Sequence, residues 1–335
     1  MITLIVLASI AVLIGAGWWY EKRGELADAA RFPPPGRLVD LGGRRLHLLH
    51  KGPSRRPTVV IEQGAGCPSL FWWPIVDRIA EFASVCAYDR AGIGSSDAPL
   101  RPHSPQRSAD DLHALLAGAG VPGPYVLVGH SYGGLVVRTF ARDHREDVAG
   151  LVLVDTLEEH AFFRPDVLKF YSRFCLLLRL LTFAAHVGVF RLFGKLSPAD
   201  EPKLPPDVQA RMAAAAQSPG FFHGMRVDFE ALSRLDPLQR EPGAPGSLGD
   251  LPLIVITHGQ PFPGGLAVVE RSWGAGQQRL AKLSSDSELI VATDANHMIQ
   301  LDSPDVVLDA VRRVLEAATT GKPLHAAAPK AARAL

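Results

Sequence analysis

The sequence predicts an α/β protein with a doubly wound, mostly parallel sheet of eight strands. Short apolar segments such as 125–128 and 150–154 are rich in β-forming residues, which is typical of strands buried on both faces. Segments with helical periodicity lie between them. Strands that alternate with helices indicate a parallel sheet covered on both sides.

In chain order, a hairpin comes first, because the expected strands 37–41 and 44–50 flank two adjacent glycines. Further strands are expected at 58–62, 84–88, 125–128, 150–154, 252–257 and 287–292. Helices are expected at 71–82, 106–118, 132–144, 265–283 and 304–317. Together these elements predict a core made of residues 37–155 and 251–317.

A possible nucleophile lies between an expected strand and an expected helix. Residues 129–133 read Gly-His-Ser-Tyr-Gly, which fits the pattern G-x-S-x-G. In a strand–turn–helix context this pattern forms a nucleophile elbow, which holds the serine hydroxyl above the carboxyl edge of the sheet. Glycines are expected at 129 and 133 because side chains there would collide with neighbouring segments. The pattern therefore predicts Ser131 as a nucleophile.

A serine hydroxyl needs a base, and His297 is the candidate among the 12 histidines. It lies in the loop that leaves the last expected strand and precedes the helix at 304–317. Loops at the carboxyl ends of parallel strands gather at one edge of the sheet, where sites of open α/β sheets lie. We therefore expect His297 to accept the proton of Ser131.

Several segments resemble the α/β-hydrolase family of serine hydrolases, over residues 37–317. Besides the elbow, residues 59–66 are similar to the family's strand and oxyanion loop, and residues 85–97 to its Y-D-x-x-G-x-G-x-S segment. Residues 296–304 are similar to its G-H-x-x-x-x-x-x-P segment. Gln63 replaces the family's usual histidine and Asn296 its usual glycine, and neither position carries the chemistry.

The resemblance implies the α/β-hydrolase fold and the site that goes with it. Residues 156–250 interrupt the strand–helix alternation and are too long for a loop. In this family a helical cap occupies that place, inserted after strand 6. An oxyanion hole is expected from the backbone N–H of Tyr132 and, by resemblance, that of Ala65.

The acid that orients His297 is expected to be Asp155. The family's commonest position for it is the loop after the seventh strand, but residues 257–265 contain no Asp or Glu. A minority arrangement in the family uses the end of the sixth strand, where Asp155 lies. The alternatives are Glu158, Glu159 and Glu270.

Composition and motifs limit the remaining functions. The net charge of +1 gives no basic surface for nucleic acid, and the three cysteines are expected to be free thiols. Dinucleotide, Walker and zinc-protease patterns do not occur, so no cofactor or metal is expected. We expect hydrolysis of carboxylic esters or related acyl compounds. A non-catalytic binding protein and a cofactor-free perhydrolase or haloperoxidase using the same triad are the alternatives.

The two ends of the chain are expected to lie outside the catalytic domain. Residues 2–20 carry no charge and end in Trp-Trp-Tyr before Lys22 and Arg23. This pattern predicts an uncleaved single-span anchor over residues 1–24, with the domain on the cytoplasmic side. A cleaved signal peptide is the alternative, but the usual basic n-region is missing and no A-x-A site follows. A linker at 25–36 and a disordered tail at 318–335 complete the expected organisation.

The cap indicates the kind of substrate. Residues 167–199 contain no acidic residue, and as one continuous helix they would gather Lys169, Arg173, Arg191 and Lys195 within an arc of roughly 80°. A basic amphipathic helix suits an anionic bilayer, whereas an ordinary lid helix packed on the core is the alternative. We expect a small-molecule, hydrophobic acyl substrate presented from or near a membrane.

Overall fold

An eight-stranded sheet forms the centre of the protein, with the order β1-β2-β4-β3-β5-β6-β7-β8. The computed structural model describes residues 1–162, 164–194, 203–233, 243–262 and 267–324. β2 pairs antiparallel with β1 and β4, and the other neighbours pair in parallel. The strands are β1 (Arg37–Asp40), β2 (Arg45–Lys51), β3 (Thr58–Glu62), β4 (Val85–Tyr88), β5 (Tyr125–His130), β6 (Val148–Val154), β7 (Leu253–His258) and β8 (Ser287–Ala292). This is the α/β-hydrolase fold, and it confirms the expected fold class.

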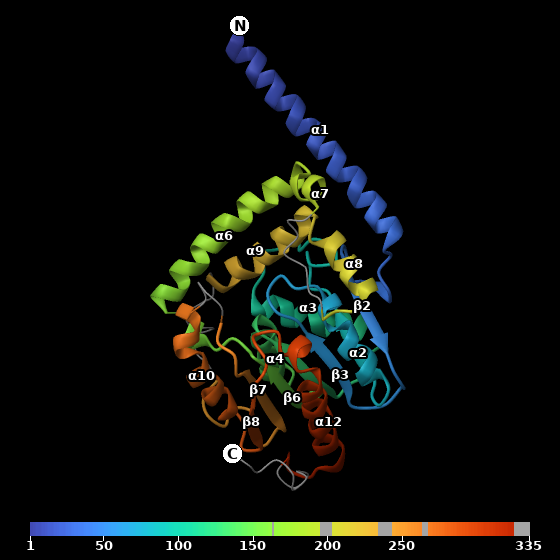
Figure 1. Cartoon of the computed structure of the whole chain (residues 1–335). Helices are drawn as coiled ribbons and strands as arrows, with labels where there is room; N and C mark the ends of the chain where they lie inside the picture. The colour runs from blue at the N-terminus through green and yellow to red at the C-terminus, as the bar shows by residue number, and fades with distance from the viewer. Residues whose placement is uncertain (163, 195–202, 234–242, 263–266, 325–335) are drawn as a thin grey trace.

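Helices cover both faces of the sheet (Figure 1). One face packs against α3 (Pro105–Gly118), α4 (Tyr132–Asp143) and α10 (Ala267–Ala281). The other packs against α2 (Trp73–Ala80) and α12 (Pro304–Thr320). Short helical turns complete the core: η1 (Ser69–Trp72), η2 (Arg145–Asp147) and α11 (Ile299–Asp302).

The strands form where the sequence is apolar at consecutive positions, because both faces of the sheet are buried. In β5, Leu127 contacts the core beneath α3 and α4, whereas Val126 and Val128 contact the core beneath α2 and α12. β5 lies between β3 and β6, with Gly129 opposite both Glu62 and Leu153. The residue that follows β5 therefore leaves the middle of the sheet at its carboxyl edge.

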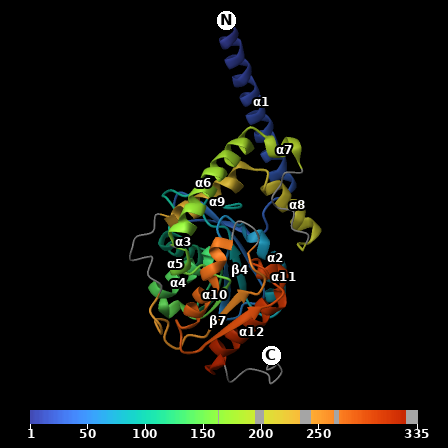
Figure 2. The same cartoon turned by 60° about the vertical axis from the view of Figure 1, so that its left-hand side comes forward.

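A helical cap follows β6 and lies over that edge (Figures 1 and 2). Its described helices are α5 (Glu159–Phe162), α6 (Pro165–His186), α7 (Val189–Phe193), α8 (Pro206–Ala215) and α9 (Pro219–Ser233). The arc of cations requires one continuous helix over 167–199, and this condition is not met, because α6 ends at His186. Gly188 adopts a left-handed conformation with φ +73°, which ends α6 and starts α7 in a new direction. Arg191 therefore lies on a different helix from Lys169 and Arg173, and Lys195 lies outside the described residues.

The N-terminal helix α1 (Ile2–Arg31) extends away from the rest of the protein (Figure 1). It is long and apolar enough to cross a membrane by length and composition, a test that a signal sequence near the N-terminus also passes. The helix continues past the expected anchor, so residues 25–31 are helical and the expected linker is corrected to residues 32–36. The reason is local: residues 25–30 include good helix formers, and the proline at 33 restricts Phe32 away from the helical region.

The expected C-terminal tail is also shorter than the sequence suggests. α12 continues to Thr320, and Leu324 is buried, with its backbone N–H donating to the Asp286 carboxylate. The apolar pattern of α12 extends far enough to bury Ala317 against the sheet. The rest of the expected tail, residues 325–335, lies outside the described residues.

Candidate active site

Ser131 lies at a strained turn between β5 and α4. Its φ of 52° and ψ of −120° are unusual for a residue with a side chain. The turn is possible because the glycines beside it allow close packing: a Cβ on Gly133 would lie 2.4 Å from the backbone oxygen of Glu62. The elbow predicted from G-x-S-x-G is therefore present, and it exposes the serine at the sheet's carboxyl edge.

His297 reaches Ser131 from the loop after β8. Its Nε2 lies 3.1 Å from Ser131 Oγ, and its Nδ1 lies 2.6 Å from Asp155 Oδ2. Three residues from three separate loops, at sequence separations of 166 and 142 residues, thus form one hydrogen-bonded chain. They are the three residues expected from the sequence as nucleophile, base and acid.

Asp155 is completely buried at the end of β6. Burial alone would raise the pKa of its carboxyl, but hydrogen bonds from His258 and His297 outweigh burial and hold the pKa well below its usual range. The second oxygen accepts Trp273 Nε1–H at 2.8 Å and the backbone N–H of His258 at 3.2 Å. Asp155 is therefore a carboxylate held in place by several donors.

The other acidic candidates lie elsewhere. Glu158 binds Arg279, with Nη2 to Oε2 at 2.6 Å, and Glu159 binds Arg138 at 2.9 Å. The carboxylate of Glu270 lies 3.2 Å from His258 Nε2. Asp155 is the carboxylate that contacts the His297 ring, with its Oδ2 2.6 Å from Nδ1.

His258 is a site residue that the sequence analysis misses. Its Nδ1 lies 2.6 Å from the same Asp155 oxygen that His297 contacts, and its other nitrogen faces Glu270. Burial opposes the charged ring, but bonds to Asp155 and Glu270 raise the pKa of His258 overall. Its position at the carboxyl end of the seventh strand is the signal that could have indicated it.

The atoms of Asp155, His258 and His297 also lie close enough together for a metal site. Both ring nitrogens, however, lie 2.6 Å from one carboxylate oxygen. Two ligands of a tetrahedral ion with bonds of about 2.0 Å lie about 3.3 Å apart. The spacing of this group therefore fits hydrogen bonds better than shared metal ligation.

The expected oxyanion loop lies against the elbow. A Cβ on Gly64 would lie 3.3 Å from Ser131 Cβ, and Ala65 and Tyr132 line the same cavity as Ser131. Tyr132 begins α4, where backbone N–H groups have no partner within the helix. The structure thus places both expected donor residues beside the serine.

Arg90 and Asp228 fix this loop, and neither is identified as a site residue from the sequence. Arg90 Nη1 donates to the carbonyl of Gln63 and Nη2 to that of Gly64, each at 2.6 Å. Asp228, from cap helix α9, accepts from Arg90 at 2.7 Å and from the backbone N–H of Gly66 at 2.7 Å. Burial raises the pKa of Asp228, but the charge of Arg90 and the bond from His103 lower it to about 2. The cap therefore fastens the oxyanion loop through a buried ion pair.

His130, the residue before the serine, contacts the backbone of the loop that carries His297. Its Nε2–H donates to the backbone oxygen of His297 at 3.0 Å, which fixes the loop that carries the histidine. Burial, together with the neighbouring His297, lowers the pKa of His130 to about 3, so the ring is neutral in the folded protein.

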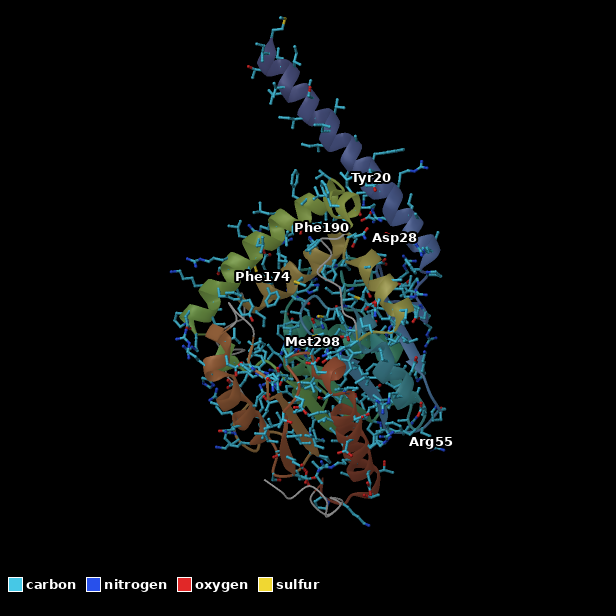
Figure 3. The ribbon with its side chains drawn as sticks, viewed as in Figure 1. Tyr20, Asp28, Arg55, Phe174, Phe190 and Met298 are labelled. Carbon is cyan, nitrogen blue, oxygen red and sulfur yellow. The ribbon has the colours of Figure 1, made fainter. Side chains whose placement is uncertain are left out.

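The cavity above Ser131 is mainly apolar. Its volume is about 440 Å³, and its far wall comes from the cap. On α6, Tyr171 and Phe174 pack against Phe229 of α9, with ring centroids 4.8 and 5.3 Å apart. Figure 3 shows Phe174 below α6 and Met298 near the centre of the molecule, and both residues line the cavity. Such walls favour a ligand with hydrophobic groups.

The sheet order, the elbow and the cap after β6 define an α/β protein with a covered site at the carboxyl edge of its sheet. The chain belongs to the alpha/beta hydrolase family, whose model matches residues 59–310.

The individual relatives share between about a fifth and about a third of their aligned residues with this chain. The chain is 25% identical over 272 residues to the "Uncharacterized protein YqjL" of Bacillus subtilis, covering 80% of this chain and 87% of that protein. It is 36% identical over 157 residues to a Hormonema carpetanum protein named "Probable transporter efuK", which covers 45% of this chain but only 22% of that protein. Among solved structures, the enol-lactonase from Burkholderia xenovorans LB400 is similar, with a TM-score of 0.63, 21% identity and coverage of 84% of this chain and all of the other.

Proposed function

We propose that this protein is a serine hydrolase that cleaves carboxylic esters with hydrophobic groups through Ser131, His297 and Asp155. The observation that carries the proposal is the hydrogen-bonded chain from Ser131 Oγ through the His297 ring to Asp155. The apolar cavity around the serine supports hydrophobic acyl or alcohol groups.

The proposed reaction has two halves. Ser131 Oγ attacks the acyl carbon while His297 Nε2 takes its proton, and the backbone N–H groups of Ala65 and Tyr132 stabilise the oxyanion. The C–O bond to the alcohol then breaks, and His297 returns the proton to the departing alcohol. Water, deprotonated by the same ring, attacks the acyl-enzyme and releases the acid and the free serine.

The proposal is tested with p-nitrophenyl esters of increasing acyl length. Wild-type protein should hydrolyse them with a maximum at medium or long chains, and Ser131→Ala should lose this activity while its melting temperature stays within a few degrees. Activity that survives the substitution would overturn the assignment of Ser131. A maximum at acetate would overturn the hydrophobic substrate and leave the nucleophile standing.

We also propose that α1 is an uncleaved anchor that crosses a membrane once, with the catalytic domain on the cytoplasmic side. Its length and composition support this, as do Lys22 and Arg23 next to the apolar segment. Contacts between α1 and the cap, at Glu21 and Asp28, favour a helix that is retained. Intact mass of the membrane-extracted protein tests retention, and protease accessibility in sealed vesicles tests orientation. A mass lacking the first 20 or so residues would overturn the anchor.

A further inference from the structure

The cap is fastened to α1 at one corner. Gly17, Glu21, Gly24 and Asp28 are spaced at i, i+4, i+7 and i+11, so they lie on one face of α1. Arg191 of α7 binds both carboxylates on this face, with Nε to Glu21 at 3.0 Å and Nη1 to Asp28 at 2.7 Å. Glu21 is only 1% exposed, so its pair with Arg191 is shielded from water, whereas Asp28 remains partly exposed.

Glycine allows the two segments to touch. A Cβ on Gly17 would lie 2.5 Å from the backbone oxygen of Val187, and one on Gly188 would lie 2.9 Å from the ring of Tyr20. Figure 3 shows Tyr20 and Asp28 of α1 beside this corner of the cap, with Phe190 on the cap side. The contact therefore fixes the position of the cap along α1.

This position sets the height of the cap relative to a bilayer. Residues 2–16 extend beyond the cap corner (Figures 1 and 2) and would measure about 22 Å as a helix, whereas the hydrocarbon core is about 30 Å thick. The membrane boundary must therefore lie at the level of the cap corner or further along α1. The aromatic residues Trp18, Trp19 and Tyr20, which suit the interface, lie at this same level.

The cap presents exposed apolar side chains beside this level. We call them the outer cap face: Leu176, Leu177, Leu180 and Phe183 of α6, and Leu192 and Phe193 of α7. They are 47–67% exposed, although the opposite side of α6 is packed against α9. In Figure 1 the outer side of α6 is turned toward the projecting part of α1. Packing of α6 against the rest of the protein explains why its inner residues are apolar, but it does not explain why the exposed residues on its outer side are apolar.

The charges near the outer cap face favour one partner. Lys169 and Arg173 are exposed and share a helix face with Leu176 and Leu180 at 100° per residue. Residues 167–194 contain no acidic residue that would repel anionic lipids. A helix with leucine and phenylalanine beside exposed cations fits the headgroup region of an anionic bilayer.

We propose that the outer cap face is a second membrane-contact surface, which lies in the headgroup region of the bilayer that α1 spans. The inference rests on the proposed anchor. It places α6 between the bilayer and the cavity, because Phe170, Tyr171 and Phe174 on its other side line the space above Ser131. A hydrophobic ester in the membrane then reaches the site across one helix.

The test uses the full chain, one copy per nanodisc of phosphatidylcholine with phosphatidylglycerol, which excludes a second copy as the covering partner. In a Cys175→Ala parent, an environment-sensitive fluorophore is attached at Leu180→Cys, at Leu7→Cys in α1, or at Thr319→Cys on α12 far from α1. Cys67 and Cys86 should react slowly with the label, because burial raises the pKa of these thiols to about 11 and about 12. The parent protein, treated with the same label, measures this background. Quenching of each label is measured with lipids that carry doxyl groups at shallow and at deep positions of the acyl chain, because position 7 would lie near the bilayer centre.

We expect the labels at 7 and 180 to lose at least half of their emission and the label at 319 to change little. If position 7 is quenched and position 180 behaves like 319, the outer cap face does not touch lipid and the inference is overturned, while the anchor stands. Quenching at neither position overturns both proposals. Quenching at 180 alone would show that α6 touches lipid without a spanning α1, which overturns the anchor and the inference that rests on it.

A second measurement uses charge instead of a label. Leu180→Glu with Phe183→Glu should lower the hydrolysis rate several-fold for a long-chain ester embedded in vesicles and leave a dissolved short-chain ester unaffected. Thr319→Glu with Thr320→Glu adds the same two charges to exposed positions of α12 and serves as the control. An unchanged rate on the embedded ester would contradict the inference, because two charges on the outer cap face would then not affect access from the membrane.

Discussion

At the scale of single residues, Asp155 is the group on which the state of the proposed triad depends. Its carboxylate accepts hydrogen bonds from His297, His258 and Trp273. These donors keep it ionised although it is completely buried. An ionised carboxylate fixes the His297 ring with Nδ1–H toward Asp155 and Nε2 toward the serine. The nearby carboxylate of Glu270 contacts the His258 ring, at 3.2 Å from its Nε2.

Asp155→Asn should therefore abolish most activity without unfolding the protein. An amide keeps the shape of the carboxylate but favours the wrong tautomer of His297, and the corresponding change in a protease triad lowers kcat by about 10⁴. Glu270→Gln, the matched control, should remain near wild type. Steady-state kinetics on a p-nitrophenyl ester measure both. A large loss in the Glu270 variant with activity retained in the Asp155 variant would move the acid to Glu270.

The buried His130 ring should make stability depend on pH. Its pKa is lowered to about 3 in the folded protein, against about 6.5 in the unfolded chain. Between these values only the unfolded chain binds the proton, so the free energy of unfolding falls as the pH drops from about 6.5 toward 3, by up to about 1.4 kcal/mol per unit. His130→Gln keeps a donor for the His297 carbonyl but does not titrate.

Urea unfolding across this range measures the effect as the difference between wild type and His130→Gln. The variant should gain on wild type as the pH falls, and the difference should level off near pH 3. A difference that stays constant from pH 7 to pH 3 would show that His130 does not contribute in this way.

At the scale of elements, helix α9 connects the cap to the loop at residues 63–66 beside Ser131. Asp228 reaches from α9 to Arg90 and to the backbone of Gly66, so the cap and the oxyanion loop are held by the same carboxylate. This contact spans 162 residues of sequence. The local pattern of α9 contains nothing that predicts such a partner, which explains why the sequence analysis misses it.

Asp228→Asn should lower the free energy of unfolding by about 3–5 kcal/mol, because it leaves the buried Arg90 without its full counter-charge. It should also lower kcat more than it changes KM, since the loop that we propose to bind the oxyanion is loosened. Glu230→Gln on the same helix breaks partly exposed pairs, which are worth about 1 kcal/mol or less. Equal losses of stability in the two variants would contradict the proposed role of Asp228.

Regular elements are the part of the fold that the sequence predicts best. Buried strands such as β5 and β6 are continuous apolar runs, and they lie where expected. The end of α6 was harder, because Gly188 could equally have been a tolerated glycine within a helix. The left-handed conformation of Gly188, with φ +73°, shows that the chain turns there.

At the scale of the whole molecule, the topology brings the site together. Ser131, Asp155 and His297 each follow a parallel strand, and parallel strands deliver their following loops to one edge. For that reason the sequence could indicate Ser131 and His297, whereas it indicates Asp155 through resemblance to the α/β-hydrolase family. It could not predict His258, whose role depends on a carboxylate 103 residues away, or the clamp between α1 and the cap.

The most direct test of the central claim is labelling with a fluorophosphonate probe, which reacts with a serine only when a neighbouring base activates it. Full-length wild-type protein should incorporate one probe, located by peptide mass mapping on the segment that contains Ser131. Ser131→Ala should not be labelled, and His297→Ala should be labelled far more slowly. Labelling of Ser131→Ala at the wild-type rate would contradict the account.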